Sequence, residues 1–415
     1  MTLERTGREI SKCARCGSCR SVCPLLSIDH SEAAVARGKV EVIKKVREGS
    51  LGASDDIYGS FLDNCLLCGR CEVKCPNKVN TFDLFTWERN MVARGKGIPR
   101  EKKALLAGLS LSPPLGRGAA RLGKGIISLL AARVPTSSGL YYRIPSWFGK
   151  EDRYVPEIPS QSFLHSHGKG GRSLPENGSS LLFAGCVYNY LFPEVLERVC
   201  SSHPASIEVP VEQECCGLPA LASGDMEGAA ERAMRNISLF SHLDREKVVF
   251  PCASCLYMVK EVYPRLVEGT EVYREALLLS DRCIDYESYI LGERGGNLKG
   301  DVFYSDSKVS YHIPCHSLSV PGAVESSEKL LRVLLGDRYL PMKGAELCCG
   351  FGGTFNITHH DKSVRMGLRK IALAEESGTQ VIATSCSGCL LHIRESVARA
   401  GSSIKVVHVG DIIGN

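Results

Sequence analysis

Cysteine is the residue type that most clearly points to chemistry in this chain of 415 residues. All but two of its 20 cysteines, Cys200 and Cys283, stand in patterned groups. A chain of this length does not need disulfide staples. Residues 1–13, MTLERTGREISKC, also lack the apolar segment of a secretory signal. We therefore expect a cytoplasmic protein with reduced cysteines, whose thiolates are metal ligands.

Two cysteine runs near the N-terminus read CARCGSCRSVCP (residues 13–24) and CLLCGRCEVKCP (residues 65–76). Both fit the spacing C-x2-C-x2-C-x3-C-P, which binds cubane 4Fe–4S clusters. Three cysteines two residues apart wrap one cube, whereas the fourth is carried away by the turn before proline and reaches the other cube. Zinc is the alternative, but its sites usually take two CxxC pairs separated by a longer loop. The spacing predicts two cubane clusters, one bound by Cys13, Cys16, Cys19 and Cys75, the other by Cys65, Cys68, Cys71 and Cys23.

The second half of the chain repeats a pattern of five cysteines. Each copy has a single cysteine, then an adjacent pair followed by glycine, then a CxxC pair. Five thiolates exceed the four ligands of a zinc ion, and adjacent cysteines bind one centre only if it is large, so a multi-iron cluster is indicated. Buried structural thiols are the alternative. The first copy contains Cys186, Cys215, Cys216, Cys252 and Cys255, and the second contains Cys315, Cys348, Cys349, Cys386 and Cys389.

The elements that position these cysteines follow from the apolar pattern. Short apolar runs at residues 181–183, 248–250, 309–311 and 381–383 stop just before cysteines, and helical stretches follow each of them. This alternation predicts small parallel α/β units, in which the cysteines of one copy converge beyond the carboxyl ends of the strands. Around the N-terminal runs, residues 31–49 predict one or two helices broken near Gly38, and residues 82–96 predict another helix.

The fold class is therefore an α+β multidomain protein. Residues 1–98 form an α-helical ferredoxin domain with two 4Fe–4S clusters, residues 99–178 a basic connector rich in Gly and Pro, and residues 179–300 and 301–415 two tandem α/β domains. Residues 101–180 hold 11 Lys and Arg against 5 Asp and Glu. Within them, residues 117–134 predict a basic helix, which lies on a membrane surface or a partner, or else is a packed connector.

The chain shows no sign of other classes of function. Its net charge is only +5, and no basic run with interleaved aromatics occurs, so we expect no nucleic-acid partner. The longest apolar runs are far shorter than a membrane span. No P-loop and no flavin or nicotinamide fingerprint is present, which predicts no flavin in this chain.

The repeats resemble the cysteine-rich CCG domains of the heterodisulfide reductase family. Two ferredoxin runs followed by two CCG domains are similar to the D-type subunit of heterodisulfide reductase and to the iron–sulfur subunit of glycolate oxidase. The resemblance implies one or two non-cubane 4Fe–4S clusters, each bound by the five cysteines of one copy. Glycolate oxidase relatives often have an eroded C-terminal CxxC, whereas this chain keeps both pairs, as in the heterodisulfide-reductase branch.

Among the residues outside the cysteine patterns, His312 and His316 flank Cys315 and are the candidate catalytic residues. Their imidazoles would tune a cluster or deliver protons, with packing as the alternative role. We expect Cys200 and Cys283 to lie in the core. We expect His359 and His360 to lie in a solvated loop.

The resemblance implies an iron–sulfur electron-transfer subunit of an oxidoreductase complex. Hydroxyacid oxidation delivers a hydride, which is flavin chemistry, so an FAD-binding oxidase or another flavoprotein subunit would oxidise glycolate or lactate. Electrons would then pass toward quinone or a membrane cytochrome b, with the chain peripheral on the inner face of the membrane. The alternative is a catalytic subunit that reduces a disulfide at the non-cubane clusters. A structural zinc scaffold is a third possibility.

Overall fold

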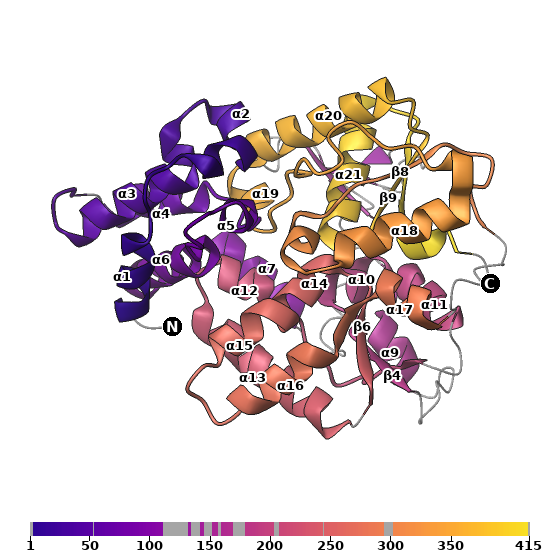
Figure 1. Cartoon of the computed structure of the whole chain (residues 1–415), viewed down its shortest axis with the longest axis horizontal. Helices are drawn as coiled ribbons and strands as arrows, with labels where there is room; N and C mark the ends of the chain where they lie inside the picture. Colours follow the sequence, from indigo (N-terminus) through magenta and orange to yellow (C-terminus); the bar gives the residue numbers. More distant parts are fainter. Residues whose placement is uncertain are drawn as a thin grey trace.

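The computed structural model describes residues 3–52, 54–110, 132–133, 142–144, 152–156, 159–168, 179–202, 207–243, 245–293 and 302–413. Within these residues, the helices of the first hundred positions lie beside two α/β units (Figure 1). One unit is drawn in magenta to salmon, and the other in orange to yellow. The expected order, an N-terminal helical region followed by two parallel α/β units, is confirmed.

The N-terminal region is helical, and its two cysteine runs lie on short turns between helices. Within each run a short helix begins after a glycine in the left-handed conformation, Gly17 (φ 84°) and Gly69 (φ 69°), which other residues rarely adopt. The elements are α1 (Leu3–Ser11), η1 (Ser18–Val22), α2 (Leu26–Asp29), η2 (Glu32–Ala34), α3 (Ala36–Arg47), α4 (Asp55–Asp63), α5 (Arg70–Val73), α6 (Thr81–Lys96) and α7 (Arg100–Ser110). The helix expected over residues 82–96 is thus α6.

The expected helix break near Gly38 is wrong. Helix α3 runs through Gly38 without interruption, and the break falls at Val35, whose backbone is extended between η2 and α3. A Cβ atom at Gly38 would lie 2.0 Å from the carbonyl oxygen of Glu32. The glycine is therefore required by the close approach of two backbones and does not mark a helix end.

The first α/β unit contains a parallel sheet with strand order β5-β4-β6-β7. In the register of its central pair, Ser180 lies opposite Lys247. The strands are β4 (Ser180–Leu182), β5 (Ile207–Glu208), β6 (Lys247–Phe250) and β7 (Cys283–Asp285). The helices are α10 (Cys186–Leu191), α11 (Pro193–Ser201), α12 (Leu218–Ala222), α13 (Met226–His242), α14 (Ala253–Tyr257), the π-helical turn η5 (Met258–Val262), α15 (Tyr263–Leu266), α16 (Tyr273–Arg282) and α17 (Tyr286–Glu293).

The second α/β unit repeats this arrangement. Its parallel sheet has the order β10-β9-β8, and a parallel bridge from Val309 to Tyr339 stands where β5 pairs with β4 in the first unit. The strands are β8 (Val309–Tyr311), β9 (Val381–Thr384) and β10 (Lys405–His408). The helices are η6 (Cys315–Ser319), α18 (Ala323–Leu335), η7 (Gly336–Arg338), α19 (Phe355–Thr358), α20 (His360–Glu376), α21 (Ser387–Ala400) and η8 (Val409–Asp411).

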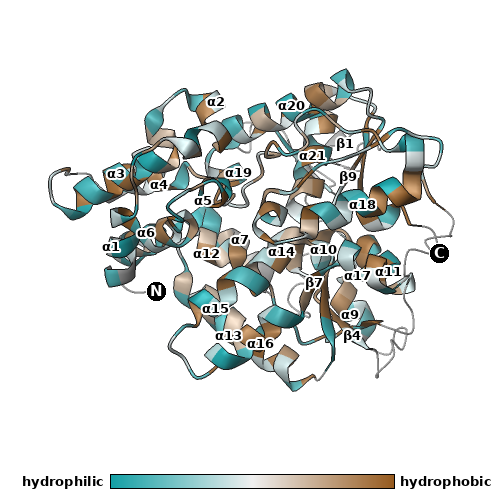
Figure 2. Ribbon diagram, in the orientation of Figure 1, coloured by the Kyte–Doolittle hydropathy of each residue, from teal (hydrophilic) through white to brown (hydrophobic). Residues whose placement is uncertain are grey.

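The long helices of both units are amphipathic. In α20 the buried residues recur every three or four positions, from Ser363 through Met366 and Lys370 to Ala374. Helix α13 follows the same rule with Ala229, Ala233 and Phe240. Figure 2 accordingly shows helices with mixed teal and brown surfaces. The two units share one continuous hydrophobic core, which also includes Phe82 and Phe85 of α6.

Strands β1 (Ala132–Arg133), β2 (Tyr142–Ile144) and β3 (Arg153–Val155) form an antiparallel sheet, and α9 (Phe163–Gly168) follows. Of these elements, β3 contacts α21, and α9 contacts α10 and α11. Most of the basic helix expected over residues 117–134 lies outside the described residues. Only Ala132 and Arg133 of this range are described, and they form β1. Across the described part of the chain, no helix has the length and apolar character needed to cross a membrane.

Candidate metal centres

The first cysteine run surrounds a hollow with about 410 Å³ of empty space. Cys13, Cys16 and Cys19 line it together with Cys75, the last cysteine of the second run. Cys16 is exposed, whereas the other three are partly buried. The structure thus brings together the four cysteines that the sequence assigns to the first cubane.

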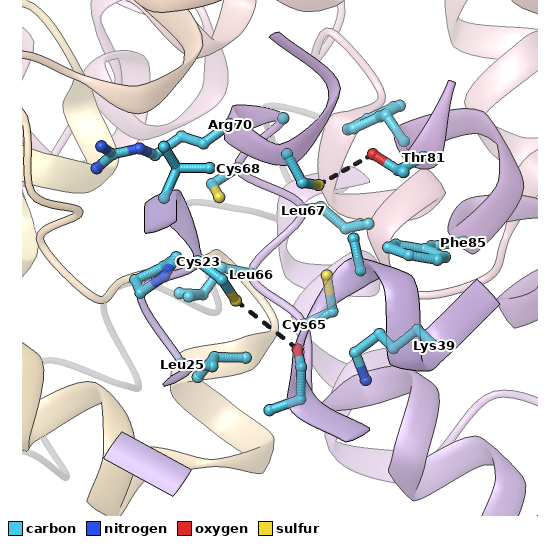
Figure 3. A pocket seen from close by; sticks show the side chains of 17 residues that line it. Cys23, Leu25, Lys39, Cys65, Leu66, Leu67, Cys68, Arg70, Thr81 and Phe85 are labelled. Atoms are coloured by element: carbon cyan, nitrogen blue, oxygen red, sulfur yellow. Dashed lines mark hydrogen bonds between the residues drawn. The ribbon is translucent and has the colours of Figure 1, made fainter. Parts of the chain in front are cut away.

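The second run surrounds a neighbouring hollow with about 460 Å³ of empty space (Figure 3). Cys65, Cys68 and Cys71 line it with Cys23, which arrives from the first run. The Cys71 Sγ lies 3.0 Å from the Thr81 hydroxyl. The second predicted set of four cysteines is therefore also assembled, and the two runs exchange their fourth cysteines.

The environment of these thiols fits an iron–sulfur cluster. Burial raises the pKa of Cys23 to about 11, and it raises the pKa of Cys68 well above the usual thiol range. Four thiolates in one buried hollow repel one another unless a cationic centre lies between them. A donor set made only of sulfur, in a hollow lined mainly by apolar groups, is the environment that binds iron–sulfur clusters.

A third cavity, with about 870 Å³ of empty space, lies between the two α/β units. Both copies of the repeat contribute to its wall, together with Leu66 and Leu67 of the second cysteine run. Cys215 stands beside this cavity, with its Sγ 3.3 Å from that of Cys186. The cysteines that line the cavity are Cys186, Cys216, Cys252, Cys255, Cys315, Cys348, Cys349, Cys386 and Cys389.

The CxxC segments of the two copies contact each other across this cavity. The Cys252 Sγ lies 3.3 Å from the Ser387 hydroxyl, and the Ser254 hydroxyl lies 3.2 Å from the Cys386 Sγ. Each five-cysteine set therefore converges beyond the ends of its own strands, as expected, but the two sets also form one composite site. The spacing of the cysteines gave no sign of this contact.

His316 connects three segments of the chain at this site. Its Nε2 donates to the Leu67 carbonyl at 3.1 Å, and its Nδ1 lies 2.9 Å from the Ser254 hydroxyl. The ring stacks on Tyr257 with centroids 4.7 Å apart. His316 therefore holds the loop of the second run against both copies of the repeat. His312, the other candidate, is fully buried near Cys349 and Cys389.

Two buried lysines beside the cysteines were not predicted. Lys39 lines the second hollow and donates to the Phe61 carbonyl at 2.6 Å, and burial lowers its pKa to about 8. Lys370 donates to the Gly344 carbonyl at 2.6 Å. Burial likewise lowers its pKa to about 8, although the negative charge of Cys349 acts to raise it. The available signal was their place on the apolar side of an amphipathic helix, where lysine is rare.

The expected solvated loop is wrong for His360, whereas His359 lies in the bend between α19 and α20 and is partly buried. His360 begins α20, is only 8% exposed, and contacts Arg153 and Arg399. The connector strand β3 folds over this segment and covers it, which the local sequence did not indicate. Cys200 and Cys283 are buried, as expected.

A buried ionic network packs against the turn formed by Cys348, Cys349 and Gly350. The Ser363 hydroxyl donates to the Gly350 carbonyl at 2.7 Å, and His392 contacts both Ser363 and Glu395. Burial acts to raise the pKa of Glu395, but the hydrogen bond from His392 and the charge of Arg399 outweigh it and lower the pKa to about 2. A carboxyl group with a lowered pKa stabilises the fold above its ordinary pKa, and this contribution is lost as pH falls toward the lowered value.

Replacing Glu395 with glutamine is therefore expected to lower the free energy of unfolding at pH 7 by about 3 kcal/mol. Urea unfolding followed by circular dichroism measures the change. Glu376→Gln is the control, because that side chain is 60% exposed in its ion pair with Lys343. Equal unfolding midpoints for Glu395→Gln and Glu376→Gln would contradict the assigned role.

The fold and the three cysteine-lined hollows define a class, that of proteins that bind several iron–sulfur clusters. Comparison with known proteins agrees. A profile described as "4Fe-4S dicluster domain" matches residues 9–79, and one described as "Cysteine-rich domain", CCG, matches residues 180–260 and 309–394. The dicluster domain implies two 4Fe–4S clusters.

Two kinds of curated relative are similar to this chain. "Lactate utilization protein A" of Lysinibacillus sphaericus (strain C3-41) is 33% identical over 226 residues, which cover 53% of this chain and 93% of the relative. "Probable glycolate oxidase iron-sulfur subunit" of Bacillus subtilis (strain 168) is 26% identical over 422 residues, which cover 98% of this chain and 93% of the relative. The chain belongs to the family of CCG-domain iron–sulfur proteins with a 4Fe–4S dicluster domain.

Proposed function

We propose that this chain is the iron–sulfur electron-transfer subunit of an oxidoreductase complex. The cysteines of the first and second hollows would each bind a cubane cluster, and those of each CCG copy a non-cubane cluster. Clusters bound there would supply one-electron carriers. The cubane ligands would be Cys13, Cys16, Cys19 and Cys75 in the first hollow, and Cys65, Cys68, Cys71 and Cys23 in the second.

The observation that carries this proposal is that the cysteine-lined hollows adjoin one another in series. Cys71 lines both the first and the second hollow. Leu66 and Leu67 line both the second hollow and the cavity between the CCG copies. Cys68 of the second hollow and Cys315 of this cavity pack against one small hydrophobic cluster, which includes Leu66. Such a series suits the passage of single electrons along the chain.

The exposure of Cys16 supports a partner at the outer end of this series, where the ligand loop is open to solvent. That partner is a flavoprotein subunit, because a hydride taken from glycolate or lactate requires a two-electron cofactor before single electrons can pass. The names of the relatives agree with such hydroxyacids. The acceptor is quinone or a membrane cytochrome, reached from the inner face of the membrane.

Iron analysis of the anaerobically purified native complex tests the proposal. We expect about 16 irons per chain, four for each of four clusters, with co-purification of an FAD protein and reduction of the clusters on adding hydroxyacid. About 8 irons per chain would remove the clusters assigned to the CCG copies. A colourless, iron-free chain would remove the proposal altogether.

The third cavity favours a second candidate function. Besides its cysteines, the wall of this cavity includes the apolar residues Leu218, Pro219 and Phe351. Cavities of this kind admit small organic ligands. Reduction of a disulfide by the isolated chain with a b-type cytochrome partner, without any flavoprotein, would favour this catalytic role.

A further inference from the structure

The two CCG copies differ at the position that follows their first strand. Phe183 follows β4 in the first copy, and His312 follows β8 in the second. Their backbones correspond, because the N–H of Phe183 donates to the Val249 carbonyl at 3.0 Å and the N–H of His312 donates to the Ala383 carbonyl at 2.9 Å. These two acceptors lie at matching places in β6 and β9. The structure thus places an imidazole where the first copy has a phenyl ring.

The residues at the neighbouring position of the central strand also differ, being apolar in the first copy and polar in the second. In the first copy Phe183 stacks on Phe250 with ring centroids 4.9 Å apart, so this place is sealed by aromatic packing. The residue that corresponds to Phe250, also two positions before the CxxC pair, is Thr384 in the second copy. The second copy has therefore exchanged two apolar side chains for two polar ones at a buried place.

These polar side chains make no hydrogen bond of normal geometry among the residues that the structure describes. This holds for both ring nitrogens of His312 and for the hydroxyl of Thr384, although both residues are 0% exposed. The carbonyl of Ala345, which accepts from the backbone N–H of Ile313, lies beside the imidazole. Burying an unpaired polar group carries a desolvation penalty, so each such group in a native protein calls for an explanation. A missing ligand atom supplies one.

The His312 ring is directed at the cysteines of its own copy. A ring nitrogen of His312 and the Sγ atoms of Cys349 and Cys389 all lie within 4.8 Å of one another.

We propose that His312 is a nitrogen ligand of the metal centre in the second CCG copy. This inference rests on the proposed function, because it requires iron at that site. The second centre then has mixed nitrogen and sulfur ligands, whereas the first has sulfur ligands alone. The imidazole adds a neutral donor to the five thiolates of the second copy, so the two centres would differ in their ligand atoms and not in their number of thiolates.

Pulsed electron paramagnetic resonance of the full chain, purified anaerobically and partly reduced, tests this assignment. Wild-type protein grown with ¹⁵N-histidine is expected to show the coupling of a directly bound nitrogen on one cluster signal. The variant His312→Phe, which copies the residue of the first repeat at similar volume, is expected to lose this coupling. It is also expected to change the reduction potential of that signal, because one ligand of the centre is lost. Bound iron is counted in each sample.

His316→Gln is the matched control, because His316 is also buried beside Cys315 but has both nitrogens in hydrogen bonds. It is expected to keep the nitrogen coupling. Absence of histidine coupling in wild-type protein with about 16 irons would overturn this inference alone. Coupling that persists in His312→Phe would overturn it as well. About 8 irons in the wild type would instead remove the CCG clusters, the part of the proposed function on which this inference rests. If His312→Phe does not fold, the presence or absence of histidine coupling in the labelled wild-type protein still tests the inference.

Discussion

Replacing Cys23 with serine is expected to remove the cluster of the second hollow and to leave the first hollow loaded. Cys23 belongs to the first cysteine run, but it lines the second hollow together with Cys65 and Cys68. The reciprocal variant Cys75→Ser is expected to empty the first hollow, because Cys75 lies there. Each variant should lose about four irons per chain, since a serine oxygen is a poor substitute for a thiolate at iron.

The two cubane signals in electron paramagnetic resonance, assigned with Cys16→Ser and Cys68→Ser, show which hollow is empty in each variant. Cys23→Ser should match Cys68→Ser, and Cys75→Ser should match Cys16→Ser. Cys200→Ser is the control, because Cys200 is buried on α11 and lines none of the three hollows. If Cys23→Ser loses the same signal as Cys16→Ser, the ligands are not exchanged between the runs.

The variant Gly38→Ala is expected to destabilise the N-terminal region by about 3 kcal/mol, although alanine favours helix. The new Cβ would lie 2.0 Å from the Glu32 carbonyl oxygen and 2.8 Å from its carbonyl carbon. These are backbone atoms, so either η2 or α3 must move. The movement would reach the second hollow, because Ala34 of η2 lines it and its carbonyl lies 3.8 Å from the Cys23 Sγ.

Thermal unfolding and iron content check this expectation. The midpoint should fall, and iron should be lost first from the second hollow. Gly7→Ala in α1 is the matched control, because no other group lies within 4 Å of a Cβ placed there, so alanine should be neutral or stabilising by about 0.5–1 kcal/mol. Unfolding of Gly38→Ala at the wild-type midpoint would show that the two backbones can separate without cost.

The helix over residues 82–96 and the strands before the cysteines were predicted because apolar periodicity is a local property. The break at Gly38 was predicted wrongly for the same reason: the glycine is needed by a contact with Glu32, which the periodicity of α3 does not contain. His360 is a further case, since the strand that covers it lies more than 200 residues earlier in the chain.

The sequence by itself determined which cysteines meet. The reach of a thiolate around a cluster is set by the few residues between ligands, so spacing alone predicted both exchanged sets of four, which the structure brings together. It also determined that each five-cysteine copy is a parallel α/β unit, because strands and helices have different hydrophobic periods.

Only the tertiary structure decided that the two copies share one cavity. It alone also placed His316 between three segments and left His312 buried without a hydrogen bond of normal geometry among the described residues. These features arise from the packing of segments that are far apart in the chain, and no local spacing records that packing.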